Sequence, residues 1–169
     1  MKKITKAKKI TILSLFVAIG LVLQYIEGKI ILSPIPVGKL GLCNIVSIIN
    51  IFMFGGKNAL AIATIRSLLG SLLFGGAMTV PYSVSGAILS TIAMWSLKRF
   101  LYPKVSLIGI SILGAAVHNI SQIAVAAIFY GSIYVFSYMP MLIITAVVSG
   151  FVTGSMAQIF TSRTKGTLL

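Results

Sequence analysis

The chain has 169 residues, of which 58% are hydrophobic and only 9% are charged. Soluble domains usually carry about 25% charged residues, so this composition excludes a soluble globular domain. The formal charge of +13 would suggest nucleic-acid binding if the basic residues shared one face. They lie instead at the ends of apolar segments, so we interpret them as determinants of membrane topology and expect no nucleic-acid partner.

Groups that could carry catalysis are scarce. Glu27 is the only acidic residue, Cys43 is the only cysteine, and the chain has one histidine. Paired-carboxylate catalysis and Mg²⁺ or Ca²⁺ sites need more carboxylates, and zinc sites need several Cys or His ligands. The sequence therefore predicts no catalytic residue, no metal and no cofactor.

The apolar segments are continuous and lack the alternation of barrel strands, which favours membrane-spanning helices. A basic N-terminal segment, residues 1–9, precedes the first of them. No clear cleavage site follows, so we interpret the apolar segment after it as a retained first membrane helix and not as part of a signal peptide. The expected fold is an all-α integral membrane protein with a single transmembrane domain, residues 10–161, and a tail, residues 162–169. We expect about six helices, with five or four as alternatives: Ile10–Ile26, Leu40–Phe54, Ala59–Phe74, Tyr82–Leu97, Val105–Tyr130 and Ile133–Phe160.

Some of these lengths are unusual. The second, third and fourth segments are shorter than the roughly 20 residues of a perpendicular span. They either extend into the adjoining loops or end inside the protein. Pro140 interrupts the sixth segment or marks its true start. The outer loop Glu27–Lys39 either covers the outer mouth of the bundle or is an ordinary connector.

The positive charges predict the orientation. If the N-terminus is cytoplasmic, eleven of the fourteen Lys and Arg residues lie on the cytoplasmic side, and only Lys29 and Lys39 lie outside. Cytoplasmic loops of membrane proteins carry such an excess. We therefore expect both termini in the cytoplasm.

Arg66 is the exception, because it falls near the middle of the third segment with no acidic residue near it in sequence. Arginine stays charged in proteins, and ionisable groups at membrane depth usually face the bundle interior or a cavity. Two interpretations remain open. Arg66 is either structural, paired with Glu27 or snorkelling to the interface, or it faces a ligand.

Other polar residues are expected in the same outer layer. His118, Asn119 and Gln122 lie on the fifth helix, with His118 about 20 Å from its cytoplasmic start at 1.5 Å per residue. Asn44, Gln24 and Glu27 lie near the outer ends of their helices. These residues either contact a ligand or form interhelical hydrogen bonds.

Small residues recur every fourth position in three places. They form rows of the kind that let membrane helices approach closely, and we expect most of them to be internal packing. Ser14 and Ala18 on the first helix could instead dock a partner helix. The rows are Ser14 and Ala18; Ser67, Ser71 and Gly75; and Ala146, Gly150 and Gly154.

Four segments together resemble one family, the Gx transporter family, often labelled heptaprenyl diphosphate synthase component I. They are KLGLCNIVSI (39–48), RSLLGSLLFGG (66–76), SVSGAILS (83–90) and SILGAAVHNISQ (111–122). Members resemble the substrate-binding S components of energy-coupling factor (ECF) transporters. The resemblance implies six helices in a bacterial cytoplasmic membrane, both termini inside, and a pocket open outward under the first loop. The chain departs from the family at Val37, which interrupts an expected Pro-Gly pair, and at Cys43, where Ala is usual.

The leading hypothesis is therefore an integral membrane subunit that binds a small organic solute with an anionic or strongly polar group. Arg66 would meet that group, Glu27 would set the loop or balance Arg66, and His118, Asn119, Gln122 and Asn44 would donate or accept hydrogen bonds. No nucleotide-binding motif is present, so energy would come from a gradient or from partner ATPases through a transmembrane coupling subunit.

Two other functions remain open. One is a non-catalytic membrane component of heptaprenyl diphosphate or quinone synthesis. Prenyl diphosphate synthases hold Mg²⁺-diphosphate with aspartate-rich motifs, and this chain contains no Asp, so it is not expected to be the enzyme by itself. The other is a structural subunit of a membrane redox assembly.

Overall fold

The computed structural model describes residues 5–30 and 41–164, which form helices joined by short turns. The main helices are α1 (Lys6–Ile30), α2 (Asn44–Phe54), α3 (Gly56–Gly70), α4 (Val80–Leu101), α5 (Leu107–Tyr130) and α6 (Met139–Thr164). Short segments of other helix types adjoin three of them: a π turn at Ser71–Gly75 follows α3, and 3₁₀ turns at Ala77–Thr79 and Ile133–Tyr138 precede α4 and α6. The described residues contain no strand, so the prediction of an all-helical fold is confirmed.

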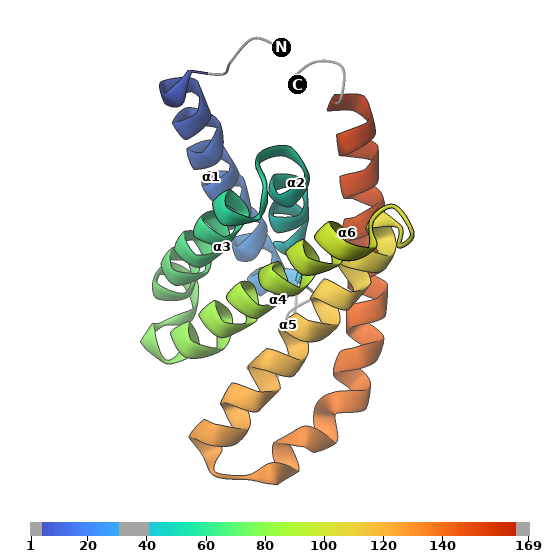
Figure 1. The fold of residues 1–169 in the computed structure, drawn as a ribbon. Coiled ribbons are helices and arrows are strands. Elements are labelled where there is room, and N and C mark those ends of the chain that lie inside the picture. Colours follow the sequence, from blue (N-terminus) through green and yellow to red (C-terminus); the bar gives the residue numbers. More distant parts are fainter. Residues whose placement is uncertain (1–4, 31–40, 165–169) are drawn as a thin grey trace.

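The helices alternate in direction, so the start of α1 and the end of α6 lie at the same end of the bundle (Figure 1). Five helical segments are long and apolar enough to cross a membrane, and α2 is a shorter apolar helix. With 11 residues, α2 is about 16 Å long, roughly half the hydrocarbon thickness. The chain is thus an integral membrane protein with five to six apolar helices.

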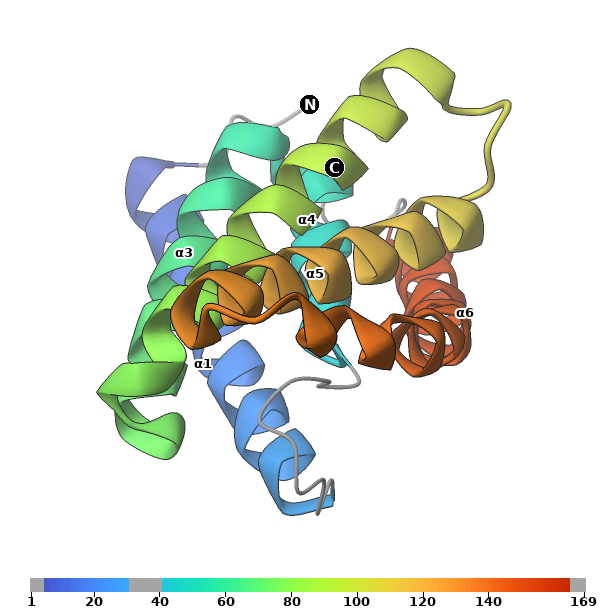
Figure 2. The same cartoon turned by 90° about the horizontal axis from the view of Figure 1, so that it is seen from below.

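α2 is the central helix. It lies between α1 and α3 on one side and α6 on the other (Figure 2), and it also contacts α4 and α5. Its own Ile48 and Ile51 have no exposed area, and neither have Met94 of α4 and Ile110 of α5, which belong to the same apolar core. Because neighbouring helices cover α2, it can end within the protein, as one of the two interpretations of the short segments predicted.

The helix boundaries differ from expectation where local backbone geometry intervenes. α2 begins at Asn44 and not at Leu40, because Gly41 has a φ of +72° and a turn at Leu42 and Cys43 follows it. Such a positive φ is accessible mainly to glycine. α6 begins at Met139, so Pro140 lies in its first turn, where its missing N–H costs no helical hydrogen bond. Pro140 therefore marks the true start of the helix.

The small residues of α6 are internal packing, as expected. A Cβ added to Gly150 would lie 2.5 Å from Ile112 Cα, and one added to Gly154 would lie 2.8 Å from Ile108 Cα. The hydroxyls of Ser111 and Thr153 form a 2.9 Å hydrogen bond in the same interface. α5 and α6 thus approach along their backbones.

The outer loop was expected to begin at Glu27, which is wrong, because residues 27–30 continue α1. Residues 31–40 lie outside the described part of the chain. The two expected roles of this segment, a cover over the outer mouth or an ordinary connector, therefore stay predictions.

Candidate functional site

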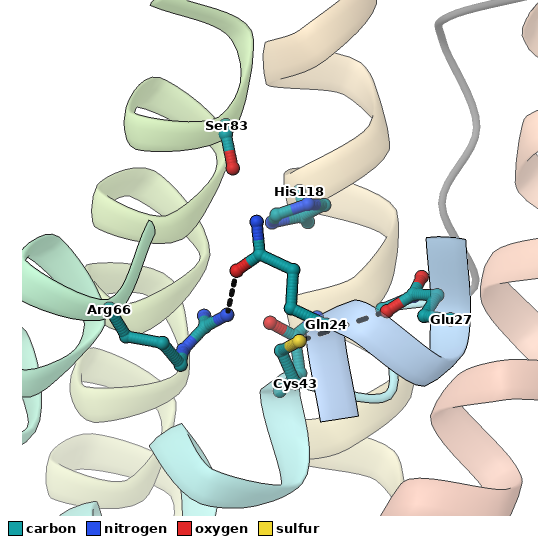
Figure 3. Close-up of a pocket in the computed structure, with 8 residues that line it drawn as sticks. Gln24, Glu27, Cys43, Arg66, Ser83 and His118 are labelled. Atoms are coloured by element: carbon teal, nitrogen blue, oxygen red, sulfur yellow. Dashed lines mark hydrogen bonds between the residues drawn. The ribbon is translucent and has the colours of Figure 1, made fainter. Parts of the chain in front are cut away.

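A small polar pocket lies where α1 to α5 converge (Figure 3). Its volume is about 10 Å³, which is enough for roughly one water molecule. All five helices or their immediate flanks contribute side chains, which is how residues far apart in sequence meet. The lining residues are Gln24, Glu27, Gly41, Cys43, Asn44, Arg66, Ser83 and His118.

Arg66 lies on one side of this pocket and is only 3% exposed. Its Nη1 donates a 3.4 Å hydrogen bond to Gln24 Oε1, and its Nε has no hydrogen-bond partner. This hydrogen bond is longer than the usual 2.7–3.2 Å. No ion pair joins Arg66 to Glu27 in the described structure, and Glu27 is the only acidic side chain of the chain. The guanidinium is thus buried without direct contact to a carboxylate in the described structure, although Glu27 lines the same pocket.

Glu27 has a different role. Its carboxylate is 2% exposed, and Oε1 accepts a 2.6 Å hydrogen bond from the backbone N–H of Gly41. The other oxygen, Oε2, accepts a 3.7 Å hydrogen bond from Cys43 Sγ. Glu27 therefore joins the end of α1 to the turn that precedes α2.

Asn44, at the start of α2, contributes unsatisfied polar atoms. Its side chain is 1% exposed, and neither the oxygen nor the nitrogen of its amide has a hydrogen-bond partner in the protein. The hydroxyl of Ser47 and the amide oxygen of Asn50, further along α2, also have none. An unsatisfied buried polar group costs about 1–3 kcal/mol, so this face of α2 favours a polar occupant such as water or a ligand group.

The three candidate site residues of α5, His118, Asn119 and Gln122, have two different environments. His118 and Gln122 lie over Gly86 of α4, where an added Cβ would be 2.9 Å from the His118 ring and 3.2 Å from Gln122 Cγ. Gln122 Oε1 has no hydrogen-bond partner. Asn119 instead donates a 2.9 Å hydrogen bond from Nδ2 to the backbone oxygen of Leu142 on α6. His118 therefore lines the pocket with Gln122 one turn away, while Asn119 ties α5 to α6.

Ser14 and Ala18 lie away from this pocket, on an exposed part of α1. Ser14 lines an apolar groove of about 290 Å³ between α1 and α3, together with side chains such as Val17, Asn58 and Ile62. The groove lies nearer the helix starts than the pocket does. This position is compatible with docking of a partner helix.

The comparisons with known proteins agree with the sequence motifs. A family model described as heptaprenyl diphosphate synthase component I matches residues 16–160. The chain belongs to this family. No curated protein and no solved structure matches it. The description of component I as one part of a synthase agrees with the expectation that this family member is not by itself the enzyme.

Sequence reasoning missed part of the family member's pocket. Gln24 was placed in the outer layer but not among the ligand residues, and Cys43 and Ser83 were not considered as lining. Gln24 and Glu27 are three residues apart, which places them on one helix face and could have linked them. Cys43 and Ser83 carry no such signal, because single small polar residues are common in membrane helices.

Proposed function

We propose that this protein is a substrate-binding integral membrane subunit for a small organic solute, and that Arg66 binds an anionic or strongly polar group of that solute. The observation that carries the proposal is the environment of Arg66. The guanidinium is 3% exposed, forms one long hydrogen bond to a neutral amide, and has no carboxylate partner. An arginine at the centre of a membrane helix costs about 2.5–3.5 kcal/mol, and a bound anion would offset this cost.

Neighbouring side chains would complete the binding site. The unsatisfied amide of Asn44 and the free oxygen of Gln122 can donate and accept hydrogen bonds, and His118 offers an imidazole at the same pocket. Glu27 is engaged by Gly41 and Cys43, so Arg66 is the charge available to the solute. The site thus suits a solute with one anionic group and adjacent hydrogen-bonding groups.

Entry of a solute requires side chains to move, because the pocket holds only about 10 Å³. Gln24 lies between Arg66 and His118 (Figure 3). Its amide is held by the single long bond to Arg66, so a rotation of Gln24 costs little and would free the guanidinium. We infer that the solute replaces Gln24 as the partner of Arg66.

The membrane orientation and the partners complete the proposal. Both termini face the cytoplasm of a bacterial cell, the transmembrane domain spans residues 10–161 between short tails at residues 1–9 and 162–169, and the pocket opens outward. Ser14, which lines the α1–α3 groove, and the exposed Ala18 one turn further along α1 would meet a transmembrane coupling subunit served by ATPases, as in the ECF transporters that the family resembles. The excess of Lys and Arg at one end supports this orientation.

Native mass spectrometry of gently purified protein tests the proposal. The wild type should carry a small molecule that Arg66→Ala loses, while the helical circular dichroism of the two proteins stays the same. Arg99→Ala is the matched control, because Arg99 is exposed and its loss should leave the ligand bound. If Arg66→Ala retained the same molecule, Arg66 would not be the binding residue, and loss of the fold together with the ligand would favour a structural role for Arg66.

The family match favours a second candidate, a non-catalytic membrane component of heptaprenyl diphosphate synthesis. This function predicts that the protein purifies together with a soluble synthase component, and that synthase activity falls when the chain is removed. Neither result is expected of a solute-uptake subunit. Purification of the tagged full chain from its native membrane distinguishes the two.

A further inference from the structure

Two glycines on neighbouring helices make room for the side chains that meet in the pocket. A Cβ added to Gly20 of α1 would lie 2.1 Å from Arg66 Cδ, and one added to Gly70 of α3 would lie 2.2 Å from Gln24 Oε1. Both distances are shorter than real Cβ contacts. Each helix therefore supplies one polar side chain and one glycine that receives the polar side chain of the other helix.

The two pairs are in register. α1 and α3 run in the same direction (Figure 1), and Gly20 and Gln24 are four residues apart on α1, as Arg66 and Gly70 are on α3. Residues four apart lie on one helix face, so the pairs stack one above the other. We call these four residues the reciprocal contact. The hydrogen bond between Arg66 Nη1 and Gln24 Oε1 joins its two halves.

The space beside the Gly20 backbone is filled by the Arg66 side chain and not by the backbone of another helix. The three heavy atoms nearest to an added Cβ there all belong to the Arg66 side chain, namely Cδ, Cγ and Nε. An arginine stem is flexible, and packing it against a backbone selects one arrangement, which is how supporting residues fix a binding group. The backbone oxygen of Gly20 lies 3.6 Å from Cys43 Sγ, whose single hydrogen is shared between this oxygen and Glu27 Oε2.

We propose that Gly20 and Gly70 are positioning residues of the solute site, which fix Arg66 and Gln24 with their polar ends at the pocket. This inference rests on the proposed function and adds α1 to the site as a positioning element. α1 packs mainly against α3. A change at Gly20 therefore acts on the solute through the position of Arg66.

The first test is the midpoint of thermal unfolding, Tm, followed by the fluorescence of Trp95 in the full chain in detergent. Trp95 is the only tryptophan and packs against Gly56, at the opposite end of α3 from the reciprocal contact. Gly20→Ala should lower Tm in the wild type but not in the Arg66→Ala protein, because the added methyl group would then have space. Gly28→Ala on the same helix, with no atom within 4 Å of its added Cβ, should have the same effect in both proteins. An equal loss from Gly20→Ala in both backgrounds would overturn the inference.

The second test is ligand retention, measured by native mass spectrometry with Gly70→Ala. This variant displaces only the flexible end of Gln24, so Tm should change little. Because the solute replaces Gln24 as the partner of Arg66, a displaced Gln24 no longer competes with it. Retention of the molecule that purifies with the wild type should therefore rise, by up to about tenfold in affinity when a competing hydrogen bond to a charged group is lost. Unchanged or lower retention by Gly70→Ala would overturn the role of Gly70. A wild type without any bound molecule would contradict the proposed function, whereas the Tm comparison involves no ligand and would still decide whether Gly20 positions Arg66.

Discussion

Replacing Arg66 with methionine should remove solute binding while leaving the protein as stable as before, or more stable. Methionine is unbranched and flexible, so it can keep the packing of the arginine stem over Gly20 while it removes the charge. The substitution therefore tests the effect of the guanidinium separately from the packing of the side-chain stem. A structural ion pair and a ligand-binding charge predict opposite signs for its effect on stability.

The magnitude follows from the contacts of Arg66. Removing a buried arginine from the centre of a membrane helix recovers about 2.5–3.5 kcal/mol. The hydrogen bond to Gln24 is lost, and interhelical hydrogen bonds in membranes contribute about 0.6 kcal/mol; at 3.4 Å this bond is a weak one. A water molecule in the pocket, which has space for roughly one, would offset part of the arginine cost. We therefore expect the free energy of unfolding to rise by about 1–2 kcal/mol.

Reversible unfolding in mixed detergent micelles measures this free energy, with the fluorescence of Trp95 as the signal. Arg99→Met is the matched control, because Arg99 is exposed and its substitution should change the free energy of unfolding by less than about 0.5 kcal/mol. A loss of about 2 kcal/mol or more from Arg66→Met would refute the reasoning, since it would show that the guanidinium stabilises the fold through contacts with the protein.

Three further predictions concern packing, polar contacts and topology. Gly150→Ala should destabilise the protein by about 1–3 kcal/mol in the same unfolding assay, because the added Cβ would lie 2.5 Å from the backbone Cα of Ile112; an unchanged free energy would show that α5 and α6 can separate at low cost. Asn119→Leu should lower the free energy of unfolding by about 1 kcal/mol, because the hydrogen bond to the Leu142 backbone oxygen is lost, and the bound solute should be retained. Loss of the solute at full stability would instead show that Asn119 belongs to the binding site. Single cysteines can be introduced at four turns of a Cys43→Ser protein. At Met78 and Gly131 they should react with a membrane-impermeant maleimide added outside the cell, whereas at Lys57 and Lys104 they should react only when the reagent reaches the cytoplasmic side. The reverse pattern would invert the proposed orientation.

The fold was largely predictable, because long apolar helices leave a strong signal in sequence. Five segments are long and apolar enough to span a membrane, and Pro140 indicated one of the two possible starts of α6. The start of α2 was predicted four residues too early, since the conformation of Gly41 depends on its contact with Glu27. A contact between residues 14 positions apart cannot be seen in local sequence.

The candidate site was predictable only in part, for the same reason. Charge and polarity in an apolar setting marked Arg66, His118 and Asn44, and the structure places all three at one pocket. Asn119 was grouped with His118 because the two are adjacent in sequence, yet neighbouring residues on a helix point in different directions. The contribution of Gly20 depends on which side chain crosses it. Sequence alone shows the glycine but not its neighbour.

The central claim is that Arg66 binds the solute, and the most direct test is an experimental structure of the protein purified in lipid nanodiscs with its bound molecule. We predict non-protein density within hydrogen-bonding distance of the Arg66 guanidinium, with Gln24 rotated away from the position that it occupies here. If the bound molecule lay elsewhere, and the guanidinium contacted only protein and water, the central claim would be contradicted.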